Sequence, residues 1–251
     1  MVGVATLHGF PASHYVERAR WALDAAGVAY REVAWVPGAH LLLRRRLGLA
    51  GSSVPVLERA DGPPLQGSDA ILDALDLPGR DAEVERLAAE RVGPGVRTVL
   101  YAATAGRQGV RAALLPPPWF LGVGEPRWQR AALRLAWPVL RRAILRGYSA
   151  TGGPAAVPAL AEAHLARPLD ALDGWVASGR LPPPEAGPPG RAAITAAAML
   201  APLARPASHP IYAAAPPVLE GTAREGWLAR PSLAWARALY AAHRPRIALP
   251  G

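Results

Sequence analysis

The chain has 251 residues and contains neither cysteine nor lysine. Without cysteine, a disulfide, a thiolate metal site and a cysteine nucleophile are excluded, so any thiol chemistry must use a thiol that a ligand brings. The longest apolar run, residues 192–204, is interrupted by Thr195 and is shorter than the ~20 residues of a membrane-spanning helix. Residues 1–6 have neither the basic segment nor the apolar core of a secretory signal. We therefore expect a cytoplasmic protein without a membrane partner.

Arginine supplies all the positive charge of the side chains, and the formal net charge is +9. A basic balance of this size is compatible with a nucleic-acid or an anionic-membrane partner. Apart from Arg44–Arg46 and Arg141–Arg142, however, the arginines are spread along amphipathic segments. A composition rich in arginine, alanine and proline is also typical of a GC-rich genome. We therefore expect no nucleic-acid partner, and binding to an anionic surface is the last of three functional hypotheses.

Short apolar runs and helical periodicity alternate in the first third of the chain. Residues 13–26 have the periodicity of an amphipathic helix, with Val16 on its apolar side and Glu17 opposite. A βαβ unit followed by a ββα unit is compact enough to form an α/β domain. The predicted elements are, in order, strand 4–8, helix 13–26, strand 30–36, helix 41–49, strands 56–59 and 65–66, and helix 68–75.

Beyond Pro78–Gly79 the strand signals disappear and helical periodicity dominates. Pro138 lies inside one helical pattern and predicts a kink or a helix start there. We place the domain boundary here, with an α/β domain over residues 1–78 and an all-helical domain over residues 79–251. The predicted helices are 84–92, 95–105, 128–145, 159–177, 194–204 and 233–243.

Five segments carry a family resemblance, and they follow one another in the family's order. They are FPASHYVERARWALDAAGV (10–28), SSVPVLE (52–58), LQGSDAILDALD (65–76), GRAAITAAAMLAPL (190–203) and RPSLAWARALYAAHRP (230–245). They resemble, in turn, the first helix, the cis-proline segment, the third helix, the central buried helix and the C-terminal helix of the cytosolic glutathione S-transferase superfamily. The resemblance implies a thioredoxin-like N-terminal domain (βαβ–ββα) followed by an all-α helical bundle.

The resemblance also implies an enzyme that takes glutathione as co-substrate, uses no metal and attacks a small hydrophobic electrophile. A free thiol has a pKa of ~8.5, so only a small part of it is ionised at neutral pH. A hydroxyl that donates a hydrogen bond to the sulfur favours the thiolate, and so does the positive end of a helix. Ser13 begins the first predicted helix directly after a strand, and it is our candidate catalytic residue. Taken alone, Ser13 is an ordinary helix N-cap.

Two pairs of residues are candidates for contacts with the cysteinyl and glycyl parts of glutathione. In the family the residue before the cis proline pairs with the cysteinyl backbone, which assigns this role to Val54 before Pro55. The alternative is a trans proline at the start of an edge strand. His40 and Arg44 are candidates for the glycyl carboxylate, because a cation is wanted there. The alternative for the arginine cluster is a solvated face.

The start of the third predicted helix supplies the candidates for the γ-glutamyl part of glutathione. Ser68 and the helix amides would donate hydrogen bonds to its carboxylate, with Gln66 alongside. Asp69 would pair with its ammonium group. Ser68 is otherwise an N-cap. The family usually has an acidic residue immediately before this serine, and this chain has Gly67.

Aromatic residues are the candidates for the pocket of the second substrate, which the resemblance places between the domains. They are Tyr15, Tyr101, Trp119 and Phe120, with Tyr148 as a further wall. The alternative is that these aromatic side chains belong to the core.

Two expectations concern the rest of the molecule. The central helix of the family usually begins with a capping hydroxyl and an aspartate, and here Gly190 and Ala193 stand in their places, which costs ~0.5–2 kcal/mol. The resemblance further implies a homodimer. The reaction is left open between conjugation, isomerisation, reductive dehalogenation and peroxide reduction. A non-catalytic module that binds a hydrophobic ligand or a protein is the second hypothesis.

Overall fold

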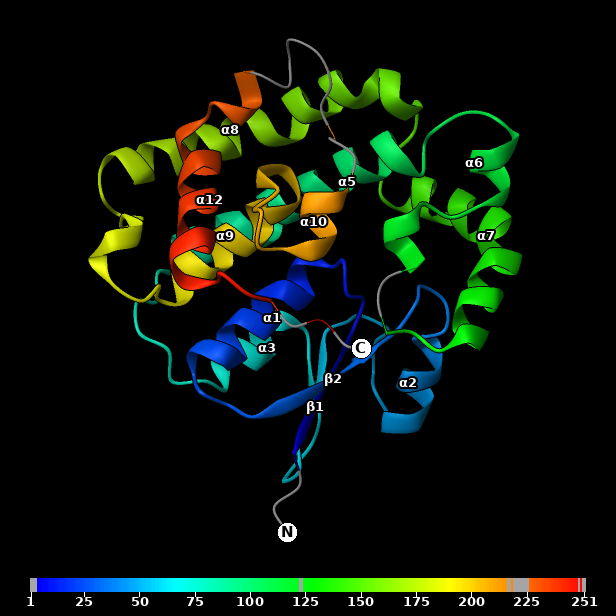
Figure 1. The fold of residues 1–251 in the computed structure, drawn as a ribbon, viewed down its shortest axis with the longest axis horizontal. Helices are drawn as coiled ribbons and strands as arrows, with labels where there is room; N and C mark the ends of the chain where they lie inside the picture. Colours follow the sequence, from blue (N-terminus) through cyan, green and yellow to red (C-terminus); the bar gives the residue numbers. More distant parts are fainter. Residues whose placement is uncertain (1–3, 122–123, 216–217, 219–225, 248, 250–251) are drawn as a thin grey trace.

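The computed structural model describes residues 4–121, 124–215, 218, 226–247 and 249, and its first third has the predicted order of strands and helices (Figure 1). Five of its seven elements end one or two residues earlier than the sequence pattern predicts, and Gly48 and the turn after Asp73 end two of these. The strands are β1 (Ala5–Gly9), β2 (Tyr30–Ala34), β3 (Val56–Glu58) and β4 (Leu65–Gln66), and the helices are α1 (His14–Ala25), α2 (Leu41–Leu47) and α3 (Ser68–Asp73).

The four strands form one sheet in the order β2-β1-β3-β4. β1 runs parallel to β2 and antiparallel to β3, so Leu7 lies between Glu32 and Leu57 at the centre of the sheet. Val16 of α1 and Ile71 of α3 are buried in the same apolar cluster as Leu7. α1 and α3 therefore cover the face of the sheet that is turned toward the helical half (Figure 1).

The helical half is built around α9 (Arg191–Ala204), every residue of which is buried. α1, α5 and α12 pack against α9, so this one helix contacts both halves of the molecule. The elements of this half are α4 (Ala82–Leu87), the π-helical turn η1 (Ala88–Val92), α5 (Gly93–Thr104), α6 (Val110–Leu114), the 3-10 turn η2 (Pro118–Leu121), α7 (Arg127–Gly147), η3 (Gly153–Ala156), α8 (Val157–Ala177), η4 (Pro184–Ala186), α9, α10 (Pro210–Ala214) and α12 (Pro231–His243).

Two short helices of the helical half were not predicted, α6 and α10, because each has only five residues and too short a pattern to show a period. α7 continues through Pro138, as the predicted helix over residues 128–145 does, so no helix starts at this proline. Among the described residues, no helix is both long and apolar enough to cross a bilayer.

The N-terminus of α9 lacks the side-chain cap, as the sequence predicts, but its amides have partners. Arg191 N–H donates to the Pro78 carbonyl at 2.8 Å, and Ala192 N–H donates to the Gly79 carbonyl at 3.1 Å. A Cβ atom at Gly190 would lie 2.7 Å from the Pro78 carbonyl oxygen. The segment between the two halves therefore replaces the missing cap with main-chain carbonyls, and it needs a glycine at position 190 to approach closely enough.

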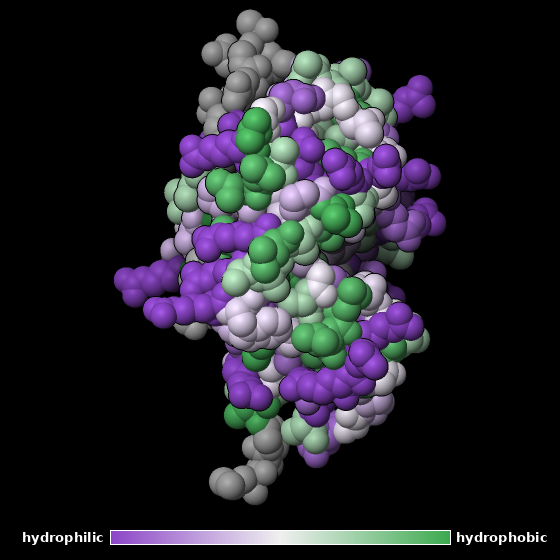
Figure 2. Space-filling view, turned by 90° about the vertical axis from the view of Figure 1, so that its right-hand side faces the viewer, coloured by the Kyte–Doolittle hydropathy of each residue, from purple (hydrophilic) through white to green (hydrophobic). Residues whose placement is uncertain are grey.

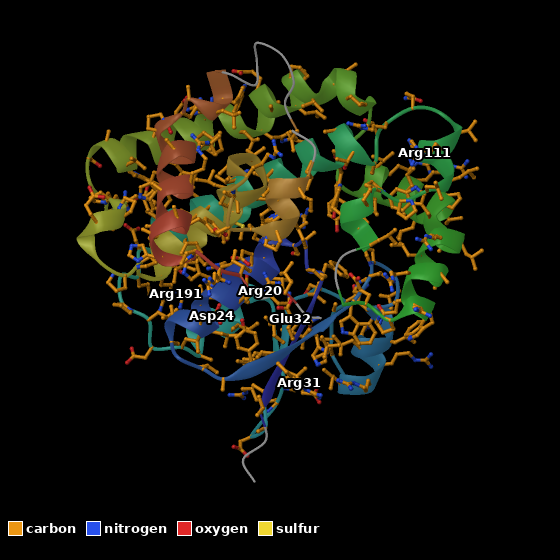
Figure 3. The ribbon with its side chains drawn as sticks, in the orientation of Figure 1. Arg20, Asp24, Arg31, Glu32, Arg111 and Arg191 are labelled. Carbon is orange, nitrogen blue, oxygen red and sulfur yellow. The ribbon has the colours of Figure 1, made fainter. Side chains whose placement is uncertain are left out.

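Both sides of α1 are buried, including the polar side that the periodicity predicts. Arg18 donates from Nε to the Thr195 hydroxyl of α9 at 2.9 Å. Glu17 accepts from Arg244 Nε at 2.6 Å and also pairs with Arg20, which donates to Glu32 of β2 (Figure 3). The charges of α1 thus join the sheet to the helical half.

Candidate functional site

A cavity of about 290 Å³ lies between the two halves at the N-terminal end of α1. The sheet half contributes the loop from β1 into α1, the segment that follows β2 and residues 52–54. The helical half contributes α5, η2 and Tyr148. Among the described residues that line it there is no carboxylate, and Arg97 is the one arginine. The cavity is therefore mainly apolar and aromatic, with a positive charge on its helical side.

Ser13 is the N-cap of α1 and lines this cavity. Its backbone is extended (φ −82°, ψ 124°), and its Oγ accepts the Val16 N–H at 3.5 Å. The contact is long for a hydrogen bond, and it uses a lone pair and not the hydroxyl hydrogen. Ser13 can therefore cap the helix and donate to a ligand atom in the cavity at the same time. The unpaired amides of the first turn add positive potential at the same place.

The segment before β3 forms another part of the cavity wall. The Val54–Pro55 peptide bond is cis, and Val54 lines the cavity whereas Pro55 is buried behind it. Gln66 supports this segment from β4, because its Nε2 donates to the Ser53 carbonyl at 3.0 Å. Gly67 N–H also donates to the Pro55 carbonyl at 2.8 Å. The third helix is thus tied to the cavity through main-chain contacts.

Comparison with known families identifies the sheet half. The model of the glutathione S-transferase N-terminal domain matches residues 7–77, the part that carries β1 through α3 and Ser13. Residues 7–77 therefore have the sequence pattern of a glutathione S-transferase N-terminal domain. A search of curated proteins found no match.

Solved structures of glutathione transferases also resemble the chain. The glutathione transferase of Phanerochaete chrysosporium has a TM-score of 0.60, with 14% sequence identity over 99% of this chain and 100% of that one. The tau class enzyme of mango, Mangifera indica, has a TM-score of 0.47 at 17% identity, covering 98% of this chain and 92% of that one. A maleylacetoacetate isomerase of Methylobacterium extorquens AM1, with bound malonate and GSH, has a TM-score of 0.40 at 18% identity, covering 97% and 100%. The first of these shows that the chain has the transferase fold along its whole length.

The residues predicted to bind the γ-glutamyl part of glutathione lie beside the cavity and not in its lining. Ser68 is buried, and its Oγ accepts a hydrogen bond from Arg18 Nη1 at 3.1 Å. Asp69 is largely exposed and pairs with the same arginine. Arg18 therefore already engages both groups. The sequence did not indicate this arginine as their partner, since it is 50 residues away from Ser68 in the chain.

Of the two residues predicted to bind the glycyl carboxylate, one lines the cavity and the other does not. His40 lines the cavity, where burial lowers the pKa of its imidazole, and its ring meets Phe10 edge-on at 4.9 Å. Arg44 lies outside the lining, is exposed and donates to the Leu49 carbonyl. Of the two, only His40 lines the cavity, and burial favours the neutral form of its imidazole.

The predicted aromatic wall is brought together at the cavity. Tyr101 stacks on Trp119 and Phe120 with ring centroids 6.0 and 5.6 Å apart, and its ring lies 5.2 Å from that of Tyr148. Tyr15 also lines the cavity, but its hydroxyl donates to the Ala89 carbonyl at 2.8 Å. The aromatic side chains therefore form an apolar wall, and the Tyr15 hydroxyl is not free to contact a thiol.

Arg97 is a charged residue of the cavity that the sequence did not indicate. It lies over the rings of Tyr15 and Tyr148, and its Nε is buried without a hydrogen-bond partner among the described residues. His14, the neighbour of Ser13, also lines the cavity, and burial, with Arg97 nearby, lowers its pKa to about 3. His14 is therefore neutral at neutral pH, and its Nε2 has no partner within the described ranges. No sequence signal marks Arg97, because its place depends on how α1 meets α5.

Within the described ranges, no group of three or more His, Asp or Glu side chains is arranged to hold a metal ion. The polar groups that the cavity offers to a ligand include the Ser13 hydroxyl, the N-terminus of α1 and the Arg97 guanidinium.

Proposed function

We propose that the chain is a glutathione transferase in which the Ser13 hydroxyl stabilises the glutathione thiolate for attack on a small electrophile. The proposal is carried by one observation: the N-cap of α1 lies in an interdomain cavity with its hydroxyl hydrogen uncommitted. His14, the nearest imidazole, is a poor base because its pKa is about 3. Thiol ionisation then relies on stabilising the anion, and the proton passes to solvent.

The reaction we assign is conjugation. The sulfur lone pair forms a bond to an electrophilic carbon, and a leaving group departs with its bonding electrons or, in an addition, a proton is taken up from solvent. The aromatic wall around Tyr101 would hold an aromatic or other flat apolar electrophile next to the sulfur. Isomerisation, dehalogenation and peroxide reduction use the same thiolate and need the same placement of Ser13.

Arg97 narrows the class of electrophile. Its guanidinium lines the cavity without a carboxylate partner among the described residues, and it packs over the rings of Tyr15 and Tyr148. A half-buried charge without a counter-charge is costly, so a ligand that supplies one gains affinity. We infer that the preferred electrophile is apolar at one end and carries a carboxylate or a similar anionic group at the other.

The experiment is a set of substitutions at Ser13. Ser13→Ala is expected to raise the pKa of bound glutathione by about one to two units and to lower kcat/KM about 10- to 100-fold, because a hydrogen bond to a charged group is lost. The measurement is the ultraviolet absorbance of the bound thiolate against pH, together with turnover of chlorodinitrobenzene. Ser13→Thr should keep both the N-cap and the hydroxyl donor, and so should retain ionisation and turnover. Unchanged ionisation in Ser13→Ala would rule out the mechanism.

A non-catalytic binding module is the second candidate. The observation that favours it is the pairing of Ser68 and Asp69 with Arg18, since these groups would otherwise hold the γ-glutamyl end of glutathione. Titration calorimetry separates the two. Binding of glutathione at sub-millimolar concentration supports the enzyme, and no heat at millimolar concentration supports the module.

We also propose that the protein is a cytoplasmic homodimer and that its two domains divide after residue 78. The match of the N-terminal domain model ends at residue 77, and α4 begins at Ala82, which supports the division. Light scattering coupled to size exclusion measures the oligomeric state directly.

A further inference from the structure

α7 carries two apolar stripes, and only one of them is used inside the protein. Leu133 and Trp137 lie on the inner stripe and are buried in the cluster that includes Phe120. Trp128, Leu135 and Val139 lie on a second stripe, where they are 52%, 85% and 72% exposed. With Ala132 between them, these positions recur every four, three and four residues, so they form one line along the helix. A surface helix needs one apolar stripe, so the outer one calls for a partner.

Two neighbouring helices extend this apolar surface. On α6, Val110 is 76% exposed and Leu114 is also exposed. On α2, Leu41 and Leu42 are exposed as well. α2, α6 and α7 lie together on the right-hand side of the molecule in Figure 1, and Figure 2 shows apolar patches interleaved with hydrophilic ones over that side. Of the large apolar residues that are exposed, nearly all belong to this region.

The charge on this surface has one sign. Residues 105–156 contain eight arginines and a single acidic residue, Glu125. None of the eight arginines forms an ion pair with a carboxylate within the described ranges. Glu125 is buried, and burial raises its pKa to about 7. The arginines are Arg107, Arg111, Arg127, Arg130, Arg134, Arg141, Arg142 and Arg146.

A recess beside α6 adds a place for an anionic group. It has a volume of about 410 Å³ and is lined by Arg107, Arg111 and the Pro116–Pro118 segment, with no acidic residue among its lining. Figure 3 shows Arg111 on α6 at the outer edge of the molecule. The recess thus sets two guanidinium groups next to the exposed apolar residues of the same helix.

We propose that the exposed surface of α6 and α7, with its exposed arginines and the stripe of Trp128, Leu135 and Val139, binds the face of a membrane that contains anionic phospholipids. Exposed apolar residues that include tryptophan, next to arginine and without acidic residues, are what a helix lying in the lipid interface requires. The stripe enters the boundary between headgroups and acyl chains, and the arginines pair with lipid phosphates. The proposal does not depend on the reaction at Ser13.

A second copy of the chain fits this surface poorly. In a two-fold symmetric dimer the same patch meets itself, so arginines would face arginines with no acidic residue to separate them. A homodimer of this protein would therefore use another face. A nucleic acid or an acidic protein would engage the arginines, but it would leave Leu135 and Val139 in water and gain nothing from them.

Sedimentation with lipid vesicles tests the proposal on the full chain. We expect the protein to bind vesicles made of equal parts phosphatidylcholine and phosphatidylglycerol, to release them at high salt, and not to bind vesicles of phosphatidylcholine alone. Replacing Leu135→Gln and Val139→Gln together should weaken binding about tenfold or more, because two apolar side chains no longer enter the lipid. Circular dichroism and glutathione-dependent turnover should stay unchanged in this variant, since both side chains are exposed and far from the cavity lining.

Two charge-matched variants complete the test. Arg134→Gln with Arg142→Gln removes two charges from the surface, and Arg86→Gln with Arg167→Gln removes two from exposed positions on α4 and α8. The first pair should lose binding and the second should keep it, although both have the same net charge. The proposal would be overturned if the protein did not bind anionic vesicles, or if the two arginine pairs lost binding equally. It would also be overturned if the protein bound heparin but not vesicles, and if Leu135→Gln with Val139→Gln did not change the binding to heparin.

Discussion

Arg97 stands out at the scale of single residues because its charge has no counterpart inside the cavity. Its guanidinium packs over two tyrosine rings, and its Nε is buried without a partner. Cation–π contacts of this kind hold the side chain in place but do not replace a hydrogen-bonded anion. Of two ligands with the same apolar part, the one that also carries an anionic group is therefore expected to bind more tightly.

Arg97→Gln is expected to reduce kcat/KM for the anionic electrophile chlorodinitrobenzoate about 10- to 100-fold, since a charge-assisted hydrogen bond is lost. Turnover of the neutral chlorodinitrobenzene should change little. The comparison of the two rates is the measurement, and Arg91→Gln, an exposed arginine outside the cavity lining, is the control. An equal loss with both electrophiles would contradict the assigned substrate class. No turnover of either compound by the unaltered protein would instead contradict the transferase proposal.

The residues of the site were only partly predictable. Ser13 and Val54 could be found because their positions follow from local order: a strand end, a helix start and a proline. Arg97 could not be found, because its place in the cavity depends on the contact between α1 and α5, which are far apart in sequence. Likewise, Ser68 and Asp69 have the expected local position, but Arg18 reaches them across the fold.

At the scale of the elements, the start of α9 shows how a main-chain contact replaces a side-chain cap. The carbonyls of Pro78 and Gly79 accept the first amides of the helix. Local sequence indicates only that the cap is missing. It does not indicate that the segment joining the two halves packs against the start of α9 and supplies the missing hydrogen-bond acceptors.

Gly190→Ser, which would supply the capping hydroxyl that the family usually has, is expected to lower the free energy of unfolding by about 1–3 kcal/mol. The new Cβ would lie 2.9 Å from the Cα of Gly79 and closer still to the Pro78 carbonyl, and this crowding outweighs the cap. Urea unfolding measures the change. Gly174→Ala in α8 is the control: its Cβ meets nothing within 4 Å, so stability should stay level or rise by about 0.5–1 kcal/mol. If the Gly190→Ser protein were more stable than the unaltered one, the side-chain cap would be worth more than the close contact with the Pro78 and Gly79 main chain, which would contradict this account.

At the scale of the whole molecule, buried ion pairs join the two halves through α1. Glu17 is fully buried between Arg20, Arg244 and His209, and the two arginines hold the pKa of its carboxyl below the ordinary value despite burial. Such a set is costly to assemble and costlier to break, because removal of one partner leaves the other charges unpaired in the interior.

Glu17→Gln is expected to lower the free energy of unfolding by about 3–5 kcal/mol at neutral pH. Glu83→Gln, which alters an exposed partner of Arg180, should cost under about 1 kcal/mol. The folded-state pKa of Glu17 lies below the unfolded value of ~4.3, so its contribution is present above that pH and is lost as the pH falls further. Unfolding curves against pH should therefore show the difference between Glu17→Gln and the unaltered protein shrinking below about pH 4. A constant difference down to strongly acidic pH would contradict the assignment.

The sequence did not predict how the charged and apolar side chains are distributed over the surface of the folded molecule. The arginines of residues 105–156 are interspersed with apolar residues, and along the chain this looks like a set of ordinary amphipathic helices. Only the packing of α7 shows that one apolar stripe is used inside and the other is left outside. The fold class, by contrast, followed from the alternation of strand and helix signals, since that pattern is local.

The anchoring of α1 on both sides has a consequence for how substrates come and go. Swinging the halves apart would pull Glu17 from Arg244 and Arg18 from Thr195, and it would leave bare charges in the gap. A hinge at the linker is therefore not an entrance. We therefore expect substrates to reach Ser13 without separation of the two halves.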